Sequence, residues 1–301
     1  SISGGSDSDI MLDIVWRCDK DNKITYVWFD TGIEYQKTKE HLLYLEKKYN
    51  ITIHREKAIK PVPLSCKQYG QPFISKQASE YIERLQKHNF DFANDGNKDF
   101  EILYEKYPKC KAALLWWCNL KGENSSFNIS RNKWLKEFMI KNPPWFLISN
   151  KCCKYAKKEL AHDYIKKHNC DLSIVGVRKA EGGTRSTAFK NCFSEKLKGS
   201  DEYRPLFWYK NQDKTDYNKA YNIKNSKCYT EYGLKRTGCA GCPFGRDFEY
   251  ELTILKQYEP QLYKAATHIF ADSYKYTRMY KQFCEERREK NEKRTIRTDV
   301  R

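Results

Sequence analysis

The sequence begins with a short polar run whose composition suits it to hold an anion. Residues 3–8 read Ser3-Gly4-Gly5-Ser6-Asp7-Ser8, and apolar residues with helical spacing follow from Ile10 to Val15. Glycines let the backbone curl so that successive N–H groups point inward, and the N-terminus of the following helix adds further donors. The run therefore predicts a cradle for phosphate or sulfate. The alternative is a glycine-rich turn that only caps the helix.

Cysteine pairs form the second group of residues that could do chemistry. The chain has 12 cysteines, and two pairs have the spacing of metal ligands: the adjacent Cys152 and Cys153, and Cys239 and Cys242 in a Cys-x-x-Cys turn before Pro243. Adjacent cysteines do not readily form a disulfide with each other, and a Cys-x-x-Cys turn directs two thiolates to one side of a loop. The pairs predict a metal site. The residues alone leave open an iron–sulfur cluster, Zn²⁺ and plain buried thiols.

Polar residues also follow a predicted strand near the N-terminus. Asp30-Thr31-Gly32 comes directly after the β-branched and aromatic run 24–29. We expect Asp30 to hydrogen-bond a ribose or adenine, or to hold Mg²⁺, and Asp7 could contact Mg²⁺ in the same way. The alternatives are turn chemistry for Asp30 and a helix cap for Asp7.

A second segment of this kind runs from Gly176 to Arg185 and follows the apolar run 172–175. It contains Arg178 and Arg185 on either side of a glycine pair. Arginine can hold two phosphate oxygens at once and suits a polyphosphate site better than lysine does. A basic loop with a surface ion pair to Glu181 is the alternative.

Strands and helices alternate in the stretch that must position these residues. The apolar run 24–29 predicts a buried strand, helical spacing follows from residue 38 to 49, and residues 51–53 predict the next strand. This alternation favours an α/β fold with a mainly parallel, doubly wound sheet, whose ligands bind beyond the carboxyl ends of the strands.

The chain is expected to contain one α/β domain and a tail. We place the domain at residues 1–250, with a helical insertion at about 61–145 and a cysteine-rich region at about 151–245, and a basic helical tail at 251–301. Within the insertion, residues 90–99 are expected to form an exposed polar loop.

These motifs together resemble a known superfamily. Ser-Gly-Gly-x-Asp-Ser is similar to the PP-loop of the ATP pyrophosphatases and phosphoadenosine-phosphosulfate (PAPS) reductases, and the resemblance covers most of residues 1–250 outside the insertion. A PP-loop normally follows a buried strand, so a strand upstream of Ser1 is expected. The cysteine set resembles that of iron–sulfur adenylylsulfate reductases, in which four thiolates hold a [4Fe–4S] centre.

The resemblance implies roles for the residues that match. The nucleotide phosphates would lie on Ser3 to Ser8 and under Gly176, Arg178 and Arg185, with Asp30, Thr31 and Gly32 beside them. The cluster would lie on Cys152, Cys153, Cys239 and Cys242. The favoured function is cleavage of ATP to an adenylylated acceptor and pyrophosphate, coupled to sulfur transfer through the cluster from a sulfur donor or an adjacent partner protein.

Two departures from the reductase pattern keep other functions open. The loop has the form typical of ATP-splitting members, and the last cysteine, Cys284, lies in Phe-Cys-Glu-Glu-Arg and does not match the reductases' Glu-Cys-Gly motif. Thiol-dependent reduction of adenylylsulfate or PAPS is the first alternative. A nucleotide- or DNA-binding regulator with a structural cluster is the second.

Composition limits the partners of the chain. A formal net charge of +17 favours a polyanionic partner such as DNA or tRNA, although a lysine-rich proteome would produce the same excess. No apolar stretch approaches the ~20 residues of a membrane span. We therefore expect a cytoplasmic protein with no membrane partner.

Overall fold

The computed structural model describes residues 1–182, 188–197, 199–245 and 247–299, with side chains as far as residue 292. The chain divides into two compact units, each assembled from separate segments. The first unit contains Ser1–Pro63, Cys153–Gly241 and Glu249–Ala266. The second contains Leu64–Cys152, Cys242–Phe248 and Thr267–Arg301.

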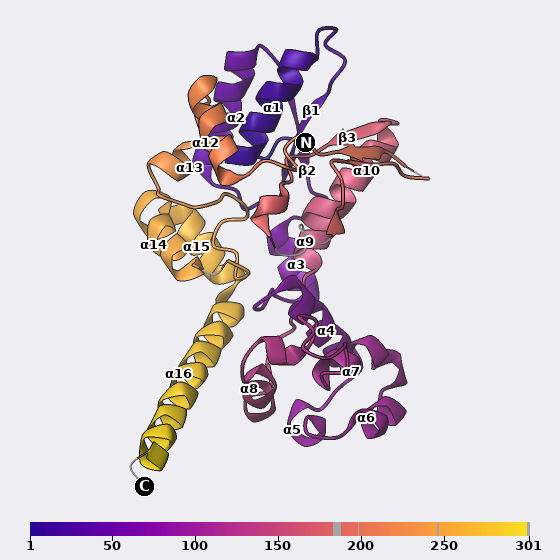
Figure 1. Cartoon of the computed structure of the whole chain (residues 1–301), viewed down its shortest axis with the longest axis vertical. Coiled ribbons are helices and arrows are strands. Elements are labelled where there is room, and N and C mark those ends of the chain that lie inside the picture. The colour runs from indigo at the N-terminus through magenta and orange to yellow at the C-terminus, as the bar shows by residue number, and fades with distance from the viewer. Residues whose placement is uncertain (183–187, 198, 246, 300–301) are drawn as a thin grey trace. The chain divides into compact units, whose positions relative to one another are not determined.

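The first unit begins with the predicted alternation of helix and strand (Figure 1). Its first elements are α1 (Ser6–Cys18), β1 (Tyr26–Asp30), α2 (Gln36–Tyr49) and β2 (Ile53–Lys57). Strands β1 and β2 are parallel, with Tyr26 opposite Ile53. Because the apolar residues of both helices recur at helical spacing, Leu12 and Leu42 are fully buried in one cluster with Trp28. This packing fixes α1, and with it the loop that precedes α1.

A second small sheet contains β3 (Leu172–Ile174), β4 (Phe193–Ser194) and β5 (Asp201–Tyr203). Strand β5 lies in the middle, parallel to β3 and antiparallel to β4. The first residues of the chain connect the two sheets: the Ser1 nitrogen donates to the Ile174 carbonyl at 2.8 Å, and the Ile2 N–H donates to the Val27 carbonyl at 2.7 Å. The mixed α/β class is confirmed. A single doubly wound sheet is not assembled among the described residues, whose strands form sheets of two and three.

The remaining helices that lie wholly or partly in the first unit surround these sheets. They are α9 (Lys151–Cys153), the π-helix η3 (Lys154–Glu159), α10 (Leu160–Lys167), η4 (Lys179–Glu181), α12 (Asn211–Ala220), α13 (Lys227–Thr230), α14 (Phe248–Tyr258) and α15 (Pro260–Ile269). Elements α9, η3 and α10 follow one another without a break, so a π-helical turn comes directly after Cys153.

The second unit is helical. Its elements are α3 (Val62–Tyr69), α4 (Lys76–Lys87), α5 (Phe92–Asp95), α6 (Phe100–Lys106), η1 (Pro108–Cys110), α7 (Lys111–Trp117), η2 (Ile129–Arg131), α8 (Leu135–Lys141) and α16 (Ala271–Asp299). Trp116, Trp117 and Phe138 form its core, and Tyr276 of α16 joins them. The expectation of an exposed loop at 90–99 was wrong, because Phe90 and Phe92 belong to this core.

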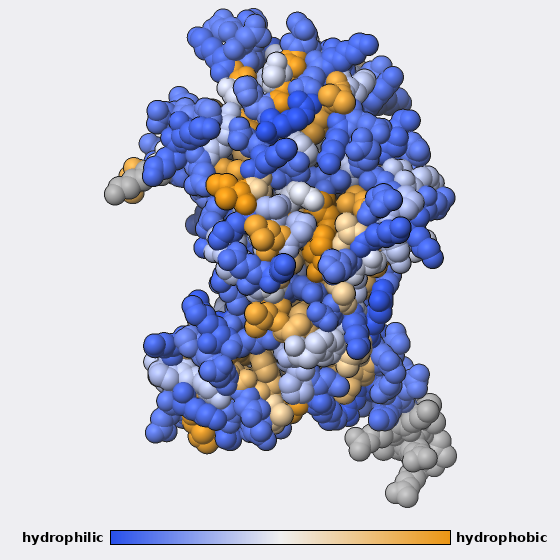
Figure 2. Space-filling model, turned by 180° about the vertical axis from the view of Figure 1, so that it is seen from behind, coloured by the Kyte–Doolittle hydropathy of each residue, from blue (hydrophilic) through white to orange (hydrophobic). Residues whose placement is uncertain are grey.

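Hydrophilic residues predominate on the face of the chain drawn in the space-filling view. Figure 2 shows one face on which hydrophobic residues occur in separate patches among charged and polar ones. Among the described residues, no helix combines the length and the apolar character that a membrane crossing needs.

Candidate functional site

The loop before α1 is shaped by its own polar groups. The Ser3 N–H donates to the Ser8 hydroxyl at 2.9 Å, and the Gly5 carbonyl accepts the first helical hydrogen bond from Asp9 at 3.0 Å. Gly4 has a φ of +66°, and a Cβ there would lie 2.9 Å from Thr38 Cγ2 on α2. Only glycine therefore fits at this position without strain. The N-terminus of α1 is held at the end of a curled backbone, as the sequence predicted.

The segment after β3 packs directly against this helix N-terminus. A Cβ on Gly176 would lie 3.2 Å from the Asp7 carbonyl oxygen, so the two backbones make close contact. Two residues later, Arg178 Nε lies 3.0 Å from Asp7 Oδ1, while the other end of its guanidinium donates to Asn211 Oδ1 at 3.1 Å. Arg178 is only 6% exposed, which fixes its charge beside the loop.

A second cation at the loop comes from α12. Lys214 Nζ lies 2.8 Å from Asp7 Oδ1 and also donates to the Ser6 hydroxyl. Lys214 was not predicted, because the polar helix that carries it has no feature that separates this lysine from Lys210 or Lys219. Two cations on one carboxylate leave a net positive charge at the N-terminus of α1, where the helix dipole also favours an anion.

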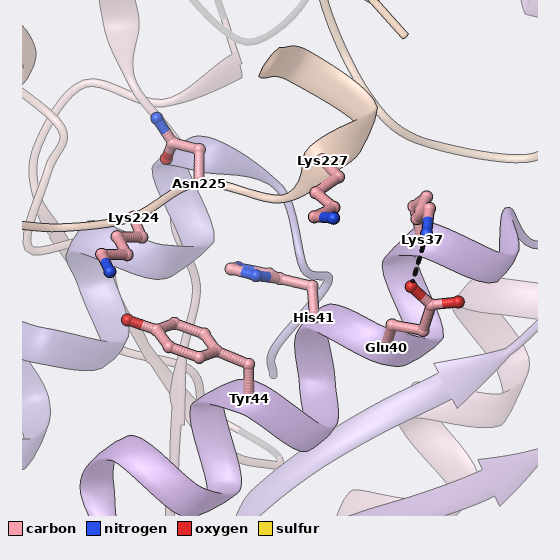
Figure 3. A pocket seen from close by; sticks show the side chains of 7 residues that line it. All are labelled: Lys37, Glu40, His41, Tyr44, Lys224, Asn225 and Lys227. Atoms are coloured by element: carbon pink, nitrogen blue, oxygen red, sulfur yellow. Dashed lines mark hydrogen bonds and ion pairs between the residues drawn. The ribbon is translucent and has the colours of Figure 1, made fainter. Parts of the chain in front are cut away.

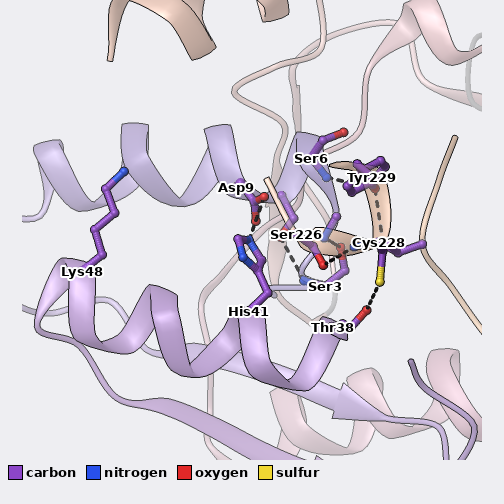
Figure 4. A network of polar contacts seen from close by, with 12 residues as sticks. Ser3, Ser6, Asp9, Thr38, His41, Lys48, Ser226, Cys228 and Tyr229 are labelled. Carbon is purple, nitrogen blue, oxygen red and sulfur yellow. Dashed lines mark hydrogen bonds and ion pairs between the residues drawn. The ribbon is translucent and has the colours of Figure 1, made fainter. Parts of the chain in front are cut away.

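Hydroxyl groups cover the other side of the loop. The Ser6 N–H donates to the Tyr229 hydroxyl at 3.2 Å (Figure 4). The same hydroxyl lies 3.4 Å from Thr237 Oγ1. Tyr229 follows Cys228 on α13, and the Cys228 thiol lies 3.6 Å from the Thr38 hydroxyl. Sequence reasoning missed Tyr229 and Thr237, since a lone hydroxyl in an irregular stretch carries no spacing signal.

A pocket of about 240 Å³ opens on the side of α2 (Figure 3). Its lining residues are Lys37, Glu40, His41, Tyr44, Lys224, Asn225 and Lys227. The buried His41 lies in its wall, with Nε2 held 3.0 Å from Oδ2 of the buried Asp9 (Figure 4). Burial raises the pKa of Asp9, and the hydrogen bond with His41 opposes that rise. This contact ties the pocket wall to the first turns of α1.

Asp30, Thr31 and Gly32 form a hydrogen-bonded turn at the end of β1. Asp30 Oδ1 accepts from the Gly32 N–H at 2.8 Å, which is the turn chemistry named above as the alternative. The Thr31 hydroxyl donates to Glu34 Oε1 at 2.6 Å, and both residues are buried. The nucleotide role of Asp30 stays a prediction.

Cys239 lies against this turn. It forms an isolated antiparallel bridge with Glu34, and its Sγ lies 3.5 Å from the Thr31 hydroxyl. Burial raises the pKa of the Cys239 thiol; Glu34 and Cys153 act in the same direction, and Lys157 opposes them. Cys153, Lys157 of the π-helix and the buried carboxyl of Glu34 thus all influence the charge of the Cys239 thiol.

A family model for the phosphoadenosine phosphosulfate reductase domain matches residues 1–101 and 119–244. The chain belongs to this family. The match contains the loop at 3–8, the segment around Arg178 and all four cysteines of the predicted set. No curated protein matched the chain.

The cluster predicted for this PAPS reductase family member needs four cysteines. Cys153 and Cys239 belong to the first unit, and Cys152 and Cys242 to the second. Among the described residues, no three His, Cys, Asp or Glu side chains are grouped closely enough to hold a metal ion. The four-cysteine set stays a prediction.

The predicted phosphate-binding positions after β3 are Gly176, Arg178 and Arg185. The structure brings Gly176 and Arg178 to the loop at 3–8. Arg185 lies outside the described residues, so its predicted contact with phosphate stays a prediction.

Proposed function

We propose that the chain binds ATP on the loop Ser3–Ser8 and splits it to pyrophosphate and an adenylylated acceptor. The observation that carries the proposal is the set of contacts at the N-terminus of α1. A position that only glycine fills without strain, close backbone packing by Gly176 and two cations on Asp7 converge there. Such a site suits an anion with several oxygens.

In this reaction the bond between the α-phosphorus and its bridging oxygen to the β-phosphate breaks, and an acceptor oxygen bonds to the α-phosphorus. The electron pair leaves with pyrophosphate. Backbone N–H groups of Gly4, Gly5 and Ser6 would hold its oxygens, with the Gly5 and Ser6 N–H groups exchanging their hydrogen bonds to Ser3 and Tyr229 for phosphate oxygens. Arg178 and Lys214 would offset its growing charge. Asp7 keeps both cations in place before the nucleotide arrives. Mg²⁺, held by Asp7 or Asp30, would add charge neutralisation.

The sulfur-transfer half of the proposal rests on the cysteines. Cys152, Cys153, Cys239 and Cys242 would hold a [4Fe–4S] cluster, with Zn²⁺ as the alternative, and the cluster would supply sulfur chemistry beside the activated acceptor. DNA or tRNA is the proposed acceptor, because a net charge of +17 attracts polyanions. A sulfur donor or an adjacent partner protein would complete the reaction.

Reduction of a sulfonucleotide is the competing function, because reductases give the family its name. Such a reductase needs a reactive thiol, and Cys284 lies in Phe-Cys-Glu-Glu-Arg, which does not match the Glu-Cys-Gly motif of the reductases.

The two functions release different products. We would incubate the anaerobically purified chain with MgATP and single-stranded DNA or tRNA and measure pyrophosphate, and with adenylylsulfate or PAPS and measure sulfite. Pyrophosphate without sulfite supports the proposal, and sulfite selects reduction. Nucleotide binding with neither product selects a non-enzymatic regulator.

A matched pair of lysines on α12 tests the site itself. Lys214→Gln removes a cation that contacts Asp7, and we expect about a tenfold loss of pyrophosphate release. Lys219→Gln changes an exposed lysine of the same helix and should leave the rate unchanged. Equal rates for both variants would contradict the assignment of the loop.

A further inference from the structure

The helical unit contains a second pocket, remote in sequence from the nucleotide loop. It has a volume of about 530 Å³, within the range of sites for small organic ligands. Polar residues that line it are Asn97, Asn119, Ser130, Asn132, Lys136, Glu137 and Lys141, together with Trp134. The apolar residues Ile129, Leu135 and Ile140 complete the lining.

Trp134 has an unusual backbone conformation at this pocket. It directly precedes α8 with φ 58° and ψ 9°, the left-handed region that a bulky side chain rarely adopts. The neighbouring Leu135 and Phe138 are buried in the core, whereas Trp134 is half-buried and lies outside that cluster. Packing of the Trp134 ring in the core therefore does not offset the cost of its left-handed backbone conformation. Backbone strain of this kind is concentrated at ligand sites.

The amides around Trp134 are held in place by the backbone. Asn119 Oδ1 accepts from the Ser130 N–H at 3.0 Å, which leaves the two amide hydrogens of Asn119 for another partner. Asn128 fixes the same stretch by accepting from the Lys121 N–H and donating to the Gly122 carbonyl, both at 2.9 Å. Backbone hydrogen bonds thus hold the side chains of Asn119 and Asn128 in the stretch that precedes Trp134.

The charges near this pocket favour a ligand that carries phosphate. Glu137, the one carboxylate in the lining, is paired with Lys141 at 2.9 Å and with Arg287 of α16. Lys136 lies in the lining, and Lys133 lies over the Trp134 ring at 6.0 Å from its centroid. A flat aromatic surface, amide donors and surplus cations form the combination that binds a base together with its backbone.

We propose that this pocket binds one unpaired base of a nucleic-acid strand, stacked on Trp134, with its edge toward Asn119 and Asn132 and its phosphates beside Lys133 and Lys136. This inference rests on the proposed function, in which DNA or tRNA is the acceptor, and it adds how the protein would hold that acceptor.

Labelled single strands test this pocket in the absence of ATP. We would measure fluorescence anisotropy of the full chain with an ordinary oligonucleotide and with an abasic strand of equal length and charge. The wild type should bind the ordinary strand more tightly. Trp134→Leu should weaken that binding about tenfold, the usual effect of losing one stacking contact, and leave the abasic strand unchanged. Lys136→Gln should weaken both strands equally.

Controls separate the pocket from misfolding and from the nucleotide loop. Glycine readily adopts the positive φ observed at position 134, so the Trp134→Gly variant should fold at least as well as the wild type although it lacks the indole ring. Trp208→Leu changes an exposed tryptophan elsewhere and should bind as the wild type does. Gly4→Val should also bind the strand normally, so failure of ATP cleavage would not imply failure here. Equal binding of both strands by the wild type, or Trp134-dependent binding of AMP as tight as that of the strand, would overturn the proposal.

Discussion

The proposed reaction needs the nucleotide loop to cleave ATP and the four cysteines to transfer sulfur. The structure describes the contacts of the loop, whereas the four-cysteine site stays a prediction. Every residue that shapes the loop lies in one unit, where Asp7 already contacts both Arg178 and Lys214. Of the four predicted cluster cysteines, Cys153 and Cys239 lie in the same unit, where Cys153 raises the pKa of the Cys239 thiol. The turn of the loop follows from its own glycines, whereas the cations beside it come from distant segments. The four cysteines also come from two distant stretches of the sequence, and their common site stays a prediction.

The largest expected effect concerns the cysteines. If all four are ligands, the anaerobically purified chain should be coloured and contain about four iron atoms, and serine at any of the four positions should remove most of the iron. Elemental analysis and a visible spectrum measure this. Cys110→Ser is the matched control, because Cys110 is fully buried but belongs to the core of the helical unit. Colourless protein with one zinc would remove the sulfur-transfer proposal.

The next effect concerns the loop. Gly4→Val places a branched side chain at φ +66° and against Thr38, and we expect the affinity for ATP to fall at least about tenfold. Titration calorimetry with MgATP measures the change. Gly199→Ala is the control, since Gly199 also has a positive φ of +92° but has open space around it. Equal losses in the two variants would mean that general destabilisation, and not loop geometry, causes the effect.

Arg178 tests whether shape or charge matters beside the loop. Arg178→Lys keeps the charge near Asp7 but loses the hydrogen bonds to Asn211 Oδ1 and the Tyr209 carbonyl. We expect the affinity for ATP to fall about fivefold, which is a smaller loss than the one expected for Gly4→Val. An affinity equal to that of the wild type would show that this arginine acts as a point charge alone.

Sequence reasoning predicted the local features better than the assembled ones. The loop, the helix after it and the strand ending at Asp30 follow from glycine content and apolar periodicity, and all three are observed. Lys214 and Tyr229 lie more than 200 residues from the loop they contact, and nothing in their own segments marks them. Residues 90–99 were mistaken for an exposed loop because polar residues outnumber Phe90 and Phe92, whose rings nevertheless pack on Trp117.

The smallest effect concerns the environment shared by Cys239 and Glu34. Burial raises the pKa of Glu34, more than the contacts with Lys157 and Thr31 lower it. A carboxyl whose folded pKa is raised stabilises the fold below its unfolded pKa and loses that contribution as pH rises through the folded value. Glu34→Gln should therefore unfold at slightly higher temperature than the wild type near pH 7, with no such gain below about pH 4.

The same substitution should change the reactivity of Cys239. Glu34 raises the pKa of that thiol, so removing its charge should lower the pKa and speed alkylation by iodoacetamide about threefold at pH 7.5. Peptide mass mapping reports the rate at this one cysteine. Glu231→Gln, which removes an exposed carboxylate of the same unit, should leave the rate unchanged. If Glu34→Gln left the rate unchanged as well, the Glu34 carboxyl would not control the reactivity of this thiol.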